Sequence, residues 1–408
     1  MNPSAPGWIL KFYNQFEKHQ LIDKYLDDNS FYNHLKSTGF IFGVSITALP
    51  DQPISNLKIT KDEFTKINLF HTLLYTYFKK YTGSDIHEAV KNIAVFYSIL
   101  EKGKTGFLTK LTLSQTPESN LEHVLSARLN ETNSEIEKKS TTALTYAMLY
   151  IDILTYRYYL NTSNVNAYDL KRYSEELESS LINCSFLALK SKKDKNKNDH
   201  QLIELYDSST DYLIGEDHLK YIHSIKSQTY LSKYDTLEKR FILDICCLAV
   251  WDDKIFDESE IQFLKQLTQV LKFSDIDLSD SIQSLKYFSK SNATKIKLFE
   301  YSSPITQLYK QSTATVKLLI LRNKNRLIKE LNESGELLVL LSQSTLRDLN
   351  ADEKSKVKEQ LLDICKSVPS LTIFLVPGGS LLLPLLVKYI PSLLPSAFQE
   401  NKIKKKDL

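Results

Sequence analysis

The sequence predicts an all-α protein, and three observations support this prediction. Glycine and proline are scarce, with 10 and 11 among 408 residues, which argues against a sandwich, a barrel or a glycine-rich nucleotide fold. Apolar residues recur at spacings of three and four along several segments, as they do on one face of a helix. Pairs of residues suited to cap a helix stand before these segments. The length predicts two or three domains, at about 150 residues per domain.

Residues 1–189 are expected to form an N-terminal helical domain. Thr60 and Glu63 have the spacing of a capping box. One helix face follows, made of Phe64, Ile67, His71, Leu74 and Phe78. We interpret His71 as a core histidine rather than a metal ligand. Residues 143–159 predict a second helix that is rich in tyrosine. The 42 Tyr and Phe rings of the chain indicate a core of large rings with hydroxyls at the surface.

A linker is expected at residues 190–200, KSKKDKNKNDH, because the run is polar, rich in lysine and without periodicity. A second helical domain is then expected over residues 201–300. Its first helix presents an apolar face and ends near Trp251. Its second helix begins at Asp257 and Glu260, which have the spacing of an N-cap and its N3 partner. The segment between them is an acidic turn.

The acidic turn has two interpretations. Its four acids could hold a divalent cation through oxygen ligands; they are Asp252, Asp253, Asp257 and Glu258. Acids at a helix N-terminus also stabilise the helix dipole without a metal. We favour the second interpretation, because the pattern and central glycine of an EF-hand loop are missing. The surrounding residues 243–267, LDICCLAVWDDKIFDESEIQFLKQL, resemble the TerB-like domain of the tellurite-resistance group, although Lys254 stands where that family usually has glycine.

Charge and motifs restrict the function. The chain has 52 Lys and Arg against 49 Asp and Glu, for a net charge of +3, so its overall charge does not capture nucleic acid. Only seven basic residues are arginines, and we expect no specific DNA partner. The sequence contains no nucleophile elbow, P-loop, dinucleotide fingerprint or HExxH motif. We therefore expect a non-enzymatic protein that needs no cofactor.

Cysteine usage and the N-terminus predict the compartment. The four cysteines have no spacing typical of disulfides or zinc; they are Cys184, Cys246, Cys247 and Cys365. Cys246 and Cys247 lie in an apolar run and are expected to be buried thiols. The N-terminal residues show no basic stretch followed by an apolar one, so no signal peptide is predicted. We expect the bulk of the protein in a reducing cytoplasm.

The C-terminal part contains an uncharged segment of membrane-spanning length. Residues 367–387 carry no charge between Lys366 and Lys388, and about 20 apolar residues cross a bilayer. Helix-breaking residues interrupt it at Pro377, Gly378, Gly379 and Pro384, so a straight isolated helix is not expected. Three arrangements remain: a single crossing, a re-entrant hairpin, or a hairpin buried in the protein. We favour the re-entrant form over the single crossing, because it keeps the flanking lysines on one side.

This part resembles the LETM family, the leucine-zipper/EF-hand transmembrane proteins of the mitochondrial inner membrane. The resemblance begins at residues 315–331, continues through LNADEKSKVKEQLLDICKSVPSL at 349–371 and is strongest in FLVPGGSLLLPLLVKYIPSLLPSAF at 374–398. Its prolines and closing Leu-Pro-Ser-x-Phe string fall where the family has them, at Pro377, Pro384, Pro391, Pro395 and Phe398. The resemblance divides the region into charged helices (301–366), a membrane segment (367–398) and a basic tail (399–408) with Lys402, Lys404, Lys405 and Lys406.

The resemblance implies a membrane-associated protein of the bacterial cytoplasmic membrane, with its soluble part in the cytoplasm. Together with the TerB-like stretch, it is similar to LETM-related biofilm-associated bacterial proteins. The implied role is membrane or envelope homeostasis, through ribosome binding or cation balance. The implied partners are a lipid membrane, the ribosome and a second copy of the chain.

Two departures from the family pattern qualify these roles. The family's ribosome-binding region is expected mostly beyond Phe398, where only ten residues follow. Gly378, Gly379 and Ser380 replace bulkier or acidic residues of the membrane segment, which disfavours cation exchange.

The alternative function is a soluble all-helical scaffold, in which residues 367–395 form a buried core hairpin.

Overall fold

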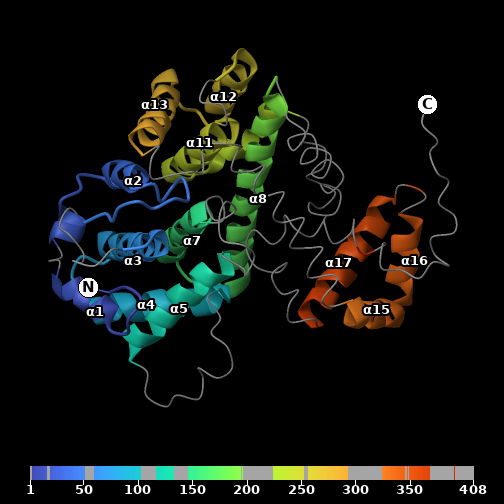
Figure 1. Cartoon of the computed structure of the whole chain (residues 1–408), viewed down its shortest axis with the longest axis horizontal. Coiled ribbons are helices and arrows are strands. Elements are labelled where there is room, and N and C mark those ends of the chain that lie inside the picture. Colours follow the sequence, from blue (N-terminus) through green and yellow to red (C-terminus); the bar gives the residue numbers. More distant parts are fainter. Residues whose placement is uncertain are drawn as a thin grey trace. The chain divides into compact units, whose positions relative to one another are not determined.

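The computed structural model describes residues 2–15, 19–50, 59–102, 116–132, 146–193, 195, 224–251, 256–292, 324–344, 347, 349–367 and 390. Every regular element within these ranges is a helix, which confirms the predicted all-α class (Figure 1). The chain divides into two compact units. The first unit consists of residues 1–193 and 229–305, and the second of residues 194–228 and 306–408.

The first unit contains most of the described helices. In chain order they are α1 (Trp8–Gln15), the π-helical turn η1 (His19–Asp23), α2 (Asp28–Ser37), α3 (Lys61–Lys80), α4 (Ile86–Leu100), α5 (Pro117–Thr132), α7 (Leu149–Asn161), α8 (Ala167–Ser191), the 3-10 turn η4 (Thr229–Lys233), α11 (Thr236–Val250), α12 (Glu258–Val270) and α13 (Asp275–Ser291). The tyrosine-rich helix predicted at 143–159 corresponds to α7, and residues 143–145 lie outside the described ranges.

The second unit contains a 3-10 turn and three described helices. They are η3 (Ile225–Ser227), α15 (Lys324–Glu333), α16 (Gly335–Gln343) and α17 (Ala351–Ser367). In the first unit, α8 packs against both α11 and α12. The helices α11 to α13, which the sequence places in a domain of their own, therefore belong to the same compact unit as the N-terminal helices.

Side-chain caps determine where several helices begin. The Thr60 hydroxyl accepts the backbone N–H of Glu63, and the Glu63 carboxylate accepts the N–H of Thr60, as the spacing predicts. Asp257 and Glu260 form the same reciprocal pair before α12, again as predicted. Removing such a cap typically costs about 1 kcal/mol of stability.

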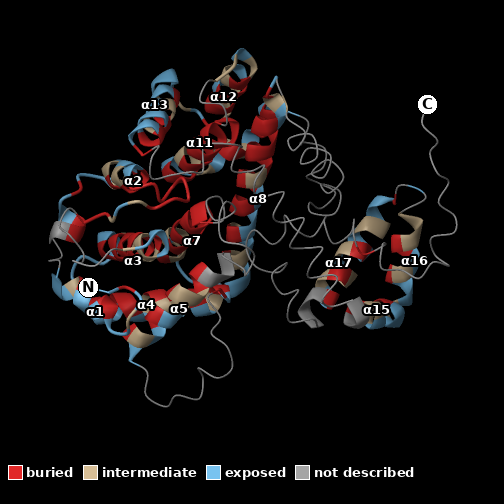
Figure 2. Ribbon diagram, in the orientation of Figure 1, coloured by how far each residue is buried: buried red, intermediate tan, exposed pale blue. Residues whose placement is uncertain are grey.

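The helix α3 is buried around much of its circumference. The predicted face is confirmed for Ile67, His71, Leu74 and Phe78, which are buried, whereas Phe64 is half-buried. The elements η1, α4, α5 and α7 pack against it, and Figure 2 shows buried residues along most of its length. It is thus a central element of the first unit rather than an amphipathic surface helix.

Large rings fill much of the core, as predicted, but their hydroxyls are not confined to the surface. The Phe31 ring stacks on the Tyr75 ring with centroids 3.7 Å apart. Tyr156 on α7 is fully buried, and its hydroxyl donates to Asn92 Oδ1 at 2.8 Å. The expectation of surface hydroxyls is wrong at such positions, because a hydroxyl that has a hydrogen-bond partner tolerates burial.

Gly39 allows the segment after α2 to pack against α13. Its φ is +88°, and a Cβ atom there would lie 2.1 Å from the Val44 carbonyl oxygen and 2.5 Å from the Phe288 ring. Only glycine fits this position without a shift of the backbone. The contact brings residues 39 and 288 together and holds α13 to the N-terminal part of the first unit.

His71 is a core histidine, as predicted. Its side chain is buried, and its Nε2 lies 2.8 Å from the Leu21 carbonyl oxygen in η1. Because a carbonyl oxygen only accepts hydrogen bonds, Nε2 carries the hydrogen. The rings of Phe12 and Phe31 meet the imidazole edge-on. Burial lowers the pKa of His71 to about 3, so this side chain is neutral at physiological pH.

We expect His71 to make stability depend on pH. Only the unfolded chain takes up this proton between about pH 6.5, the ordinary histidine pKa, and the folded pKa of about 3. The stability contribution is therefore complete above about pH 6.5 and is lost progressively as pH falls toward 3. Between pH 6 and 4, the free energy of unfolding of His71→Leu should fall less steeply than that of wild type, by up to about 1.4 kcal/mol per pH unit.

Urea unfolding at a series of pH values measures this difference. His123→Gln is the matched control, because it removes an exposed histidine in place of a buried one. Equal slopes for His71→Leu and wild type would contradict the prediction.

Candidate functional site

The C-terminal helices pack around aliphatic side chains. Buried residues on α17 recur at three and four, at Val357, Leu361 and Ile364, so they share one face of the helix. The helices α15 and α16 pack together, as do α16 and α17. The other buried residues of these helices and of the segment before α17 are Leu327, Leu331, Leu337, Leu340, Leu341 and Leu349. Ile390, beyond α17, is also buried.

A bidentate ion pair holds the start of α17. Arg347 donates to the two oxygens of Glu353 at 2.8 and 2.6 Å. The Asn350 side chain accepts the backbone N–H of Glu353, and Glu353 accepts that of Asn350. The hydrogen bonds from Arg347 and then Asn350 lower the pKa of Glu353 to about 2. This geometry fixes the first turn of α17 relative to the residues before it.

A second polar contact joins α16 to α17. Lys356 donates to Glu336 Oε1 at 2.7 Å, and Gln360 donates to Glu336 Oε2 at 3.1 Å. The bond from Lys356 lowers the pKa of Glu336. Both partners of the ion pair are more than half exposed, and exposed pairs contribute little to stability. The contact therefore sets the orientation of α17 more than its stability.

The helix α17 carries charges of both signs. Among its described side chains, the basic ones are Lys354, Lys356 and Lys358, and the acidic ones are Asp352, Glu353, Glu359 and Asp363. The helix thus offers a mixed surface and no one-signed basic face. A partner would recognise it through pairing of opposite charges rather than through bulk attraction.

The hydrophobic segment lies almost wholly outside the described residues, and so does the basic tail. This applies to Pro377, Gly378, Gly379, Pro384, Pro391, Pro395 and Phe398, and to Lys402, Lys404, Lys405 and Lys406. Among the helices of the described ranges, none combines the length and apolarity that crossing a membrane requires. The placement of residues 367–398 in a membrane stays a prediction.

The acidic turn is described only in part. Asp252 and Asp253 lie outside the described residues, and Glu258 is exposed. The Asp257 carboxylate accepts hydrogen bonds from the Glu260 N–H at 2.8 Å, the Ser259 hydroxyl at 2.5 Å and the Lys193 N–H at 3.1 Å. Partial burial raises its pKa, but these hydrogen bonds outweigh burial and lower it. Asp257 therefore acts as a helix cap.

Cation binding at the acidic turn stays a prediction. Within the part of the chain that the structure describes, no three His, Cys, Asp or Glu side chains come together as metal ligands. The Asp257 oxygens already accept bonds from the start of α12 and from the chain after α8.

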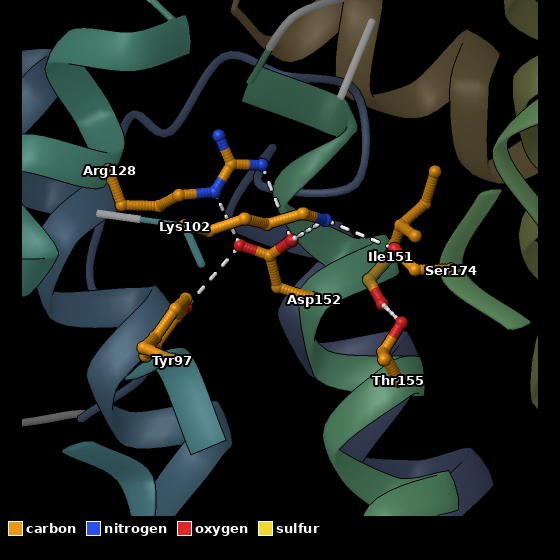
Figure 3. A network of polar contacts seen from close by, with 7 residues as sticks. All are labelled: Tyr97, Lys102, Arg128, Ile151, Asp152, Thr155 and Ser174. Atoms are coloured by element: carbon orange, nitrogen blue, oxygen red, sulfur yellow. Dashed lines mark hydrogen bonds and ion pairs between the residues drawn. The ribbon is translucent and has the colours of Figure 1, made fainter. Parts of the chain in front are cut away.

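A buried carboxylate that the sequence analysis does not single out joins four segments of the first unit (Figure 3). Asp152 on α7 accepts from Arg128 Nε on α5 at 2.7 Å and from Lys102 Nζ, just after α4, at 3.0 Å. Tyr97 on α4 donates to it at 3.4 Å, and Lys102 also donates to Ser174 on α8 at 3.0 Å. The side chains of Asp152 and Arg128 have no exposed surface, and that of Lys102 is 7% exposed.

Burial and charge act in opposite directions on this cluster. Burial raises the pKa of Asp152, but Arg128 and then Lys102 outweigh it, and the pKa is lowered. Burial lowers the pKa of Lys102, against the attraction of Asp152. The cluster is closed to solvent and its carboxylate already accepts from fixed donors. It holds helices together and offers no open site for a substrate.

A second buried carboxylate joins α2 to α11. Asp244 accepts from the Tyr32 hydroxyl at 2.7 Å and from Lys36 Nζ at 3.2 Å. All three side chains are at most 3% exposed. The signal that could have found both carboxylates is an acid inside an apolar helical run, as in LYIDILTY and FILDICCLAV. Such an acid needs a buried partner, because an unpaired charge is costly to bury.

We expect Asp152→Asn to be strongly destabilising. It removes the negative charge that both Arg128 and Lys102 contact, and breaking a buried pair typically costs about 3–5 kcal/mol. Glu176→Gln is the matched control, because the Glu176 side chain is 64% exposed beside Arg172 and should contribute at most about 1 kcal/mol. Urea unfolding measures both changes. A loss for Asp152→Asn no larger than that of the control would contradict this role.

The comparisons with known proteins concern the C-terminal region. Residues 349–408 match a family model described as LETM1-like, RBD, where RBD denotes a ribosome-binding domain. The chain has no match among curated proteins and none among solved structures. The likeness of residues 243–267 to the TerB-like domain stays a prediction. The match begins at Leu349, before the hydrophobic segment. The expectation that the family's ribosome-binding region lies mostly beyond Phe398 is therefore wrong, because the matched region already includes α17. Residues 349–408 are therefore a LETM1-like region.

Proposed function

We propose that this chain is a non-enzymatic protein that contacts ribosomes through its LETM1-like region, residues 349–408. The observation that carries the proposal is the match of this region to a family model described as a ribosome-binding domain. The helix α17 opens the region and is held in place by the Arg347–Glu353 and Glu336–Lys356 contacts. A fixed helix that carries charges of both signs supports recognition of one particular partner surface.

The basic tail would strengthen this contact. Its four lysines are Lys402, Lys404, Lys405 and Lys406, and each phosphate neutralised by a lysine releases counterions. The charges of α17 are mixed, so the tail supplies most of the one-signed charge in the region. The contact should therefore be sensitive to salt.

The proposal also places the protein at the bacterial cytoplasmic membrane, with its soluble part in the cytoplasm and a role in membrane or envelope homeostasis. The uncharged length of residues 367–387 supports this placement. A re-entrant hairpin bent at Pro377, Gly378 and Gly379 remains our preferred arrangement over a single crossing. A second copy of the chain would help to bury the backbone at the bend.

One observation favours the alternative function, a soluble scaffold. Ile390 lies within the predicted core hairpin of residues 367–395, and its side chain is fully buried. A residue that packs against protein does not face lipid. In this alternative the hydrophobic segment completes the core of the second unit, and the LETM1-like region is an interaction module.

We expect the full chain to co-sediment with ribosomes at low salt and to be released by high salt. Four phosphate contacts predict an affinity loss on the order of 100-fold between 50 and 200 mM salt. Replacing the four tail lysines with serine should weaken binding and flatten this salt dependence. The control replaces the exposed Lys80, Lys91, Lys265 and Lys290 and should bind as wild type does. No sedimentation of the wild-type chain at low salt would overturn the ribosome proposal.

We expect the full chain to remain with membranes after carbonate extraction, because a hydrophobic hairpin inserted in lipid resists alkaline release. Recovery in the soluble fraction would instead favour the scaffold. Topology is read by labelling intact cells with a membrane-impermeant thiol reagent, using Lys402→Cys in a variant without the four native cysteines. The re-entrant form predicts protection until lysis, as for the control Lys80→Cys. Labelling from outside would establish a single crossing.

A further inference from the structure

Two cysteines from distant parts of the chain meet inside the first unit. Cys184 on α8 and Cys246 on α11 are both fully buried, and their thiols are in hydrogen-bond contact. The two helices pack closely against each other and lie side by side in Figure 1. Each cysteine therefore has a second thiol as a direct neighbour, which a single buried cysteine lacks.

The next residue along α11, Cys247, faces a different environment. Its neighbours include the buried pair of Asp244 and Lys36, which belongs to the contact between α11 and α2. Successive residues on a helix point about 100° apart, so the thiols of Cys246 and Cys247 have different neighbouring side chains. The geometry thus selects Cys246, and not its neighbour, as the partner of Cys184.

We infer that Cys184 and Cys246 are a modification site, at which hydrogen peroxide converts two thiols into a disulfide between α8 and α11. One sulfur attacks the peroxide, so that an S–O bond forms, the O–O bond breaks and the first water leaves. The other sulfur attacks this sulfenic acid, so that the S–S bond forms, the S–O bond breaks and the second water leaves. The sulfurs lose two electrons, the peroxide gains them, and the two thiol protons end in the waters.

Burial determines when this reaction occurs. Desolvation raises the pKa of Cys246 well above its usual value, so the reactive thiolate is scarce while the helices are packed. Opening of the contact between α8 and α11 admits water and the oxidant together. The rate of cross-linking therefore follows this opening, and the product fixes α8 to α11.

The test treats the reduced full chain with hydrogen peroxide under native conditions, blocks the remaining thiols and maps peptides without reduction. The expected product has lost two hydrogen atoms and joins Cys184 to Cys246, and dithiothreitol reverses it. Urea below the unfolding midpoint should accelerate its formation. Cys247→Ala should retain the cross-link, whereas in Cys184→Ala the thiol of Cys246 should stay without a disulfide partner.

Other results would overturn the inference. These are oxidation of Cys184 or Cys246 only to sulfinic acid, a cross-link that uses Cys247 or Cys365 instead, or no cross-link in wild type. Mapping the wild-type chain decides the matter even where Cys184→Ala fails to fold, because it identifies the joined residues directly.

Discussion

The packing of the first unit depends on the buried carboxylate of Asp152. Its donors come from Tyr97 on α4, Arg128 on α5 and Lys102 two residues after α4. Lys102 also donates a hydrogen bond to Ser174 on α8. Removing such charges from water costs several kcal/mol per ion, so the cluster contributes little net stability against an apolar core. Its effect is on geometry: Arg128 and Lys102 must both reach one carboxylate, which restricts how α5 and α7 can slide or rotate. The tie between Asp244, Tyr32 and Lys36 restricts α2 and α11 in the same way.

Local features of the fold could be predicted from the sequence, because local physics determines them. The caps at Thr60 and Asp257 depend on residues three positions apart, and the face of α3 depends on spacings of three and four. The buried clusters could not be predicted in this way. Asp152 and its partners Arg128 and Lys102 are 24 and 50 residues apart in the chain, and no short pattern indicates that they meet.

The same distinction applies to the candidate functional region. The resemblance found its charged helix and proline pattern, because these are consecutive residues. It did not find the Arg347–Glu353 and Glu336–Lys356 contacts, which depend on how α16 turns into α17. The domain boundary expected at residues 190–200 was predicted from the polar, lysine-rich composition of that run. The first unit does break after Lys193, inside that run, but the packing of α8 on α11 and α12 places residues 229–305 in the same unit as the N-terminal helices.

The contact between Tyr32 and Asp244 has a consequence for synthesis of the protein. The two residues are 212 positions apart, and chains grow at about 5–20 residues per second. The helix α2 therefore leaves the ribosome on the order of 10–40 s before α11 is made. Throughout that interval the amine of Lys36 lacks its carboxylate partner. During the last part of it, after α8 has been made and before α11 follows, the apolar side of α8 that later covers α11 is open to water. Such a nascent chain presents the surface that holding chaperones bind, so a cell that makes this protein must shield its N-terminal half until the middle of the chain emerges.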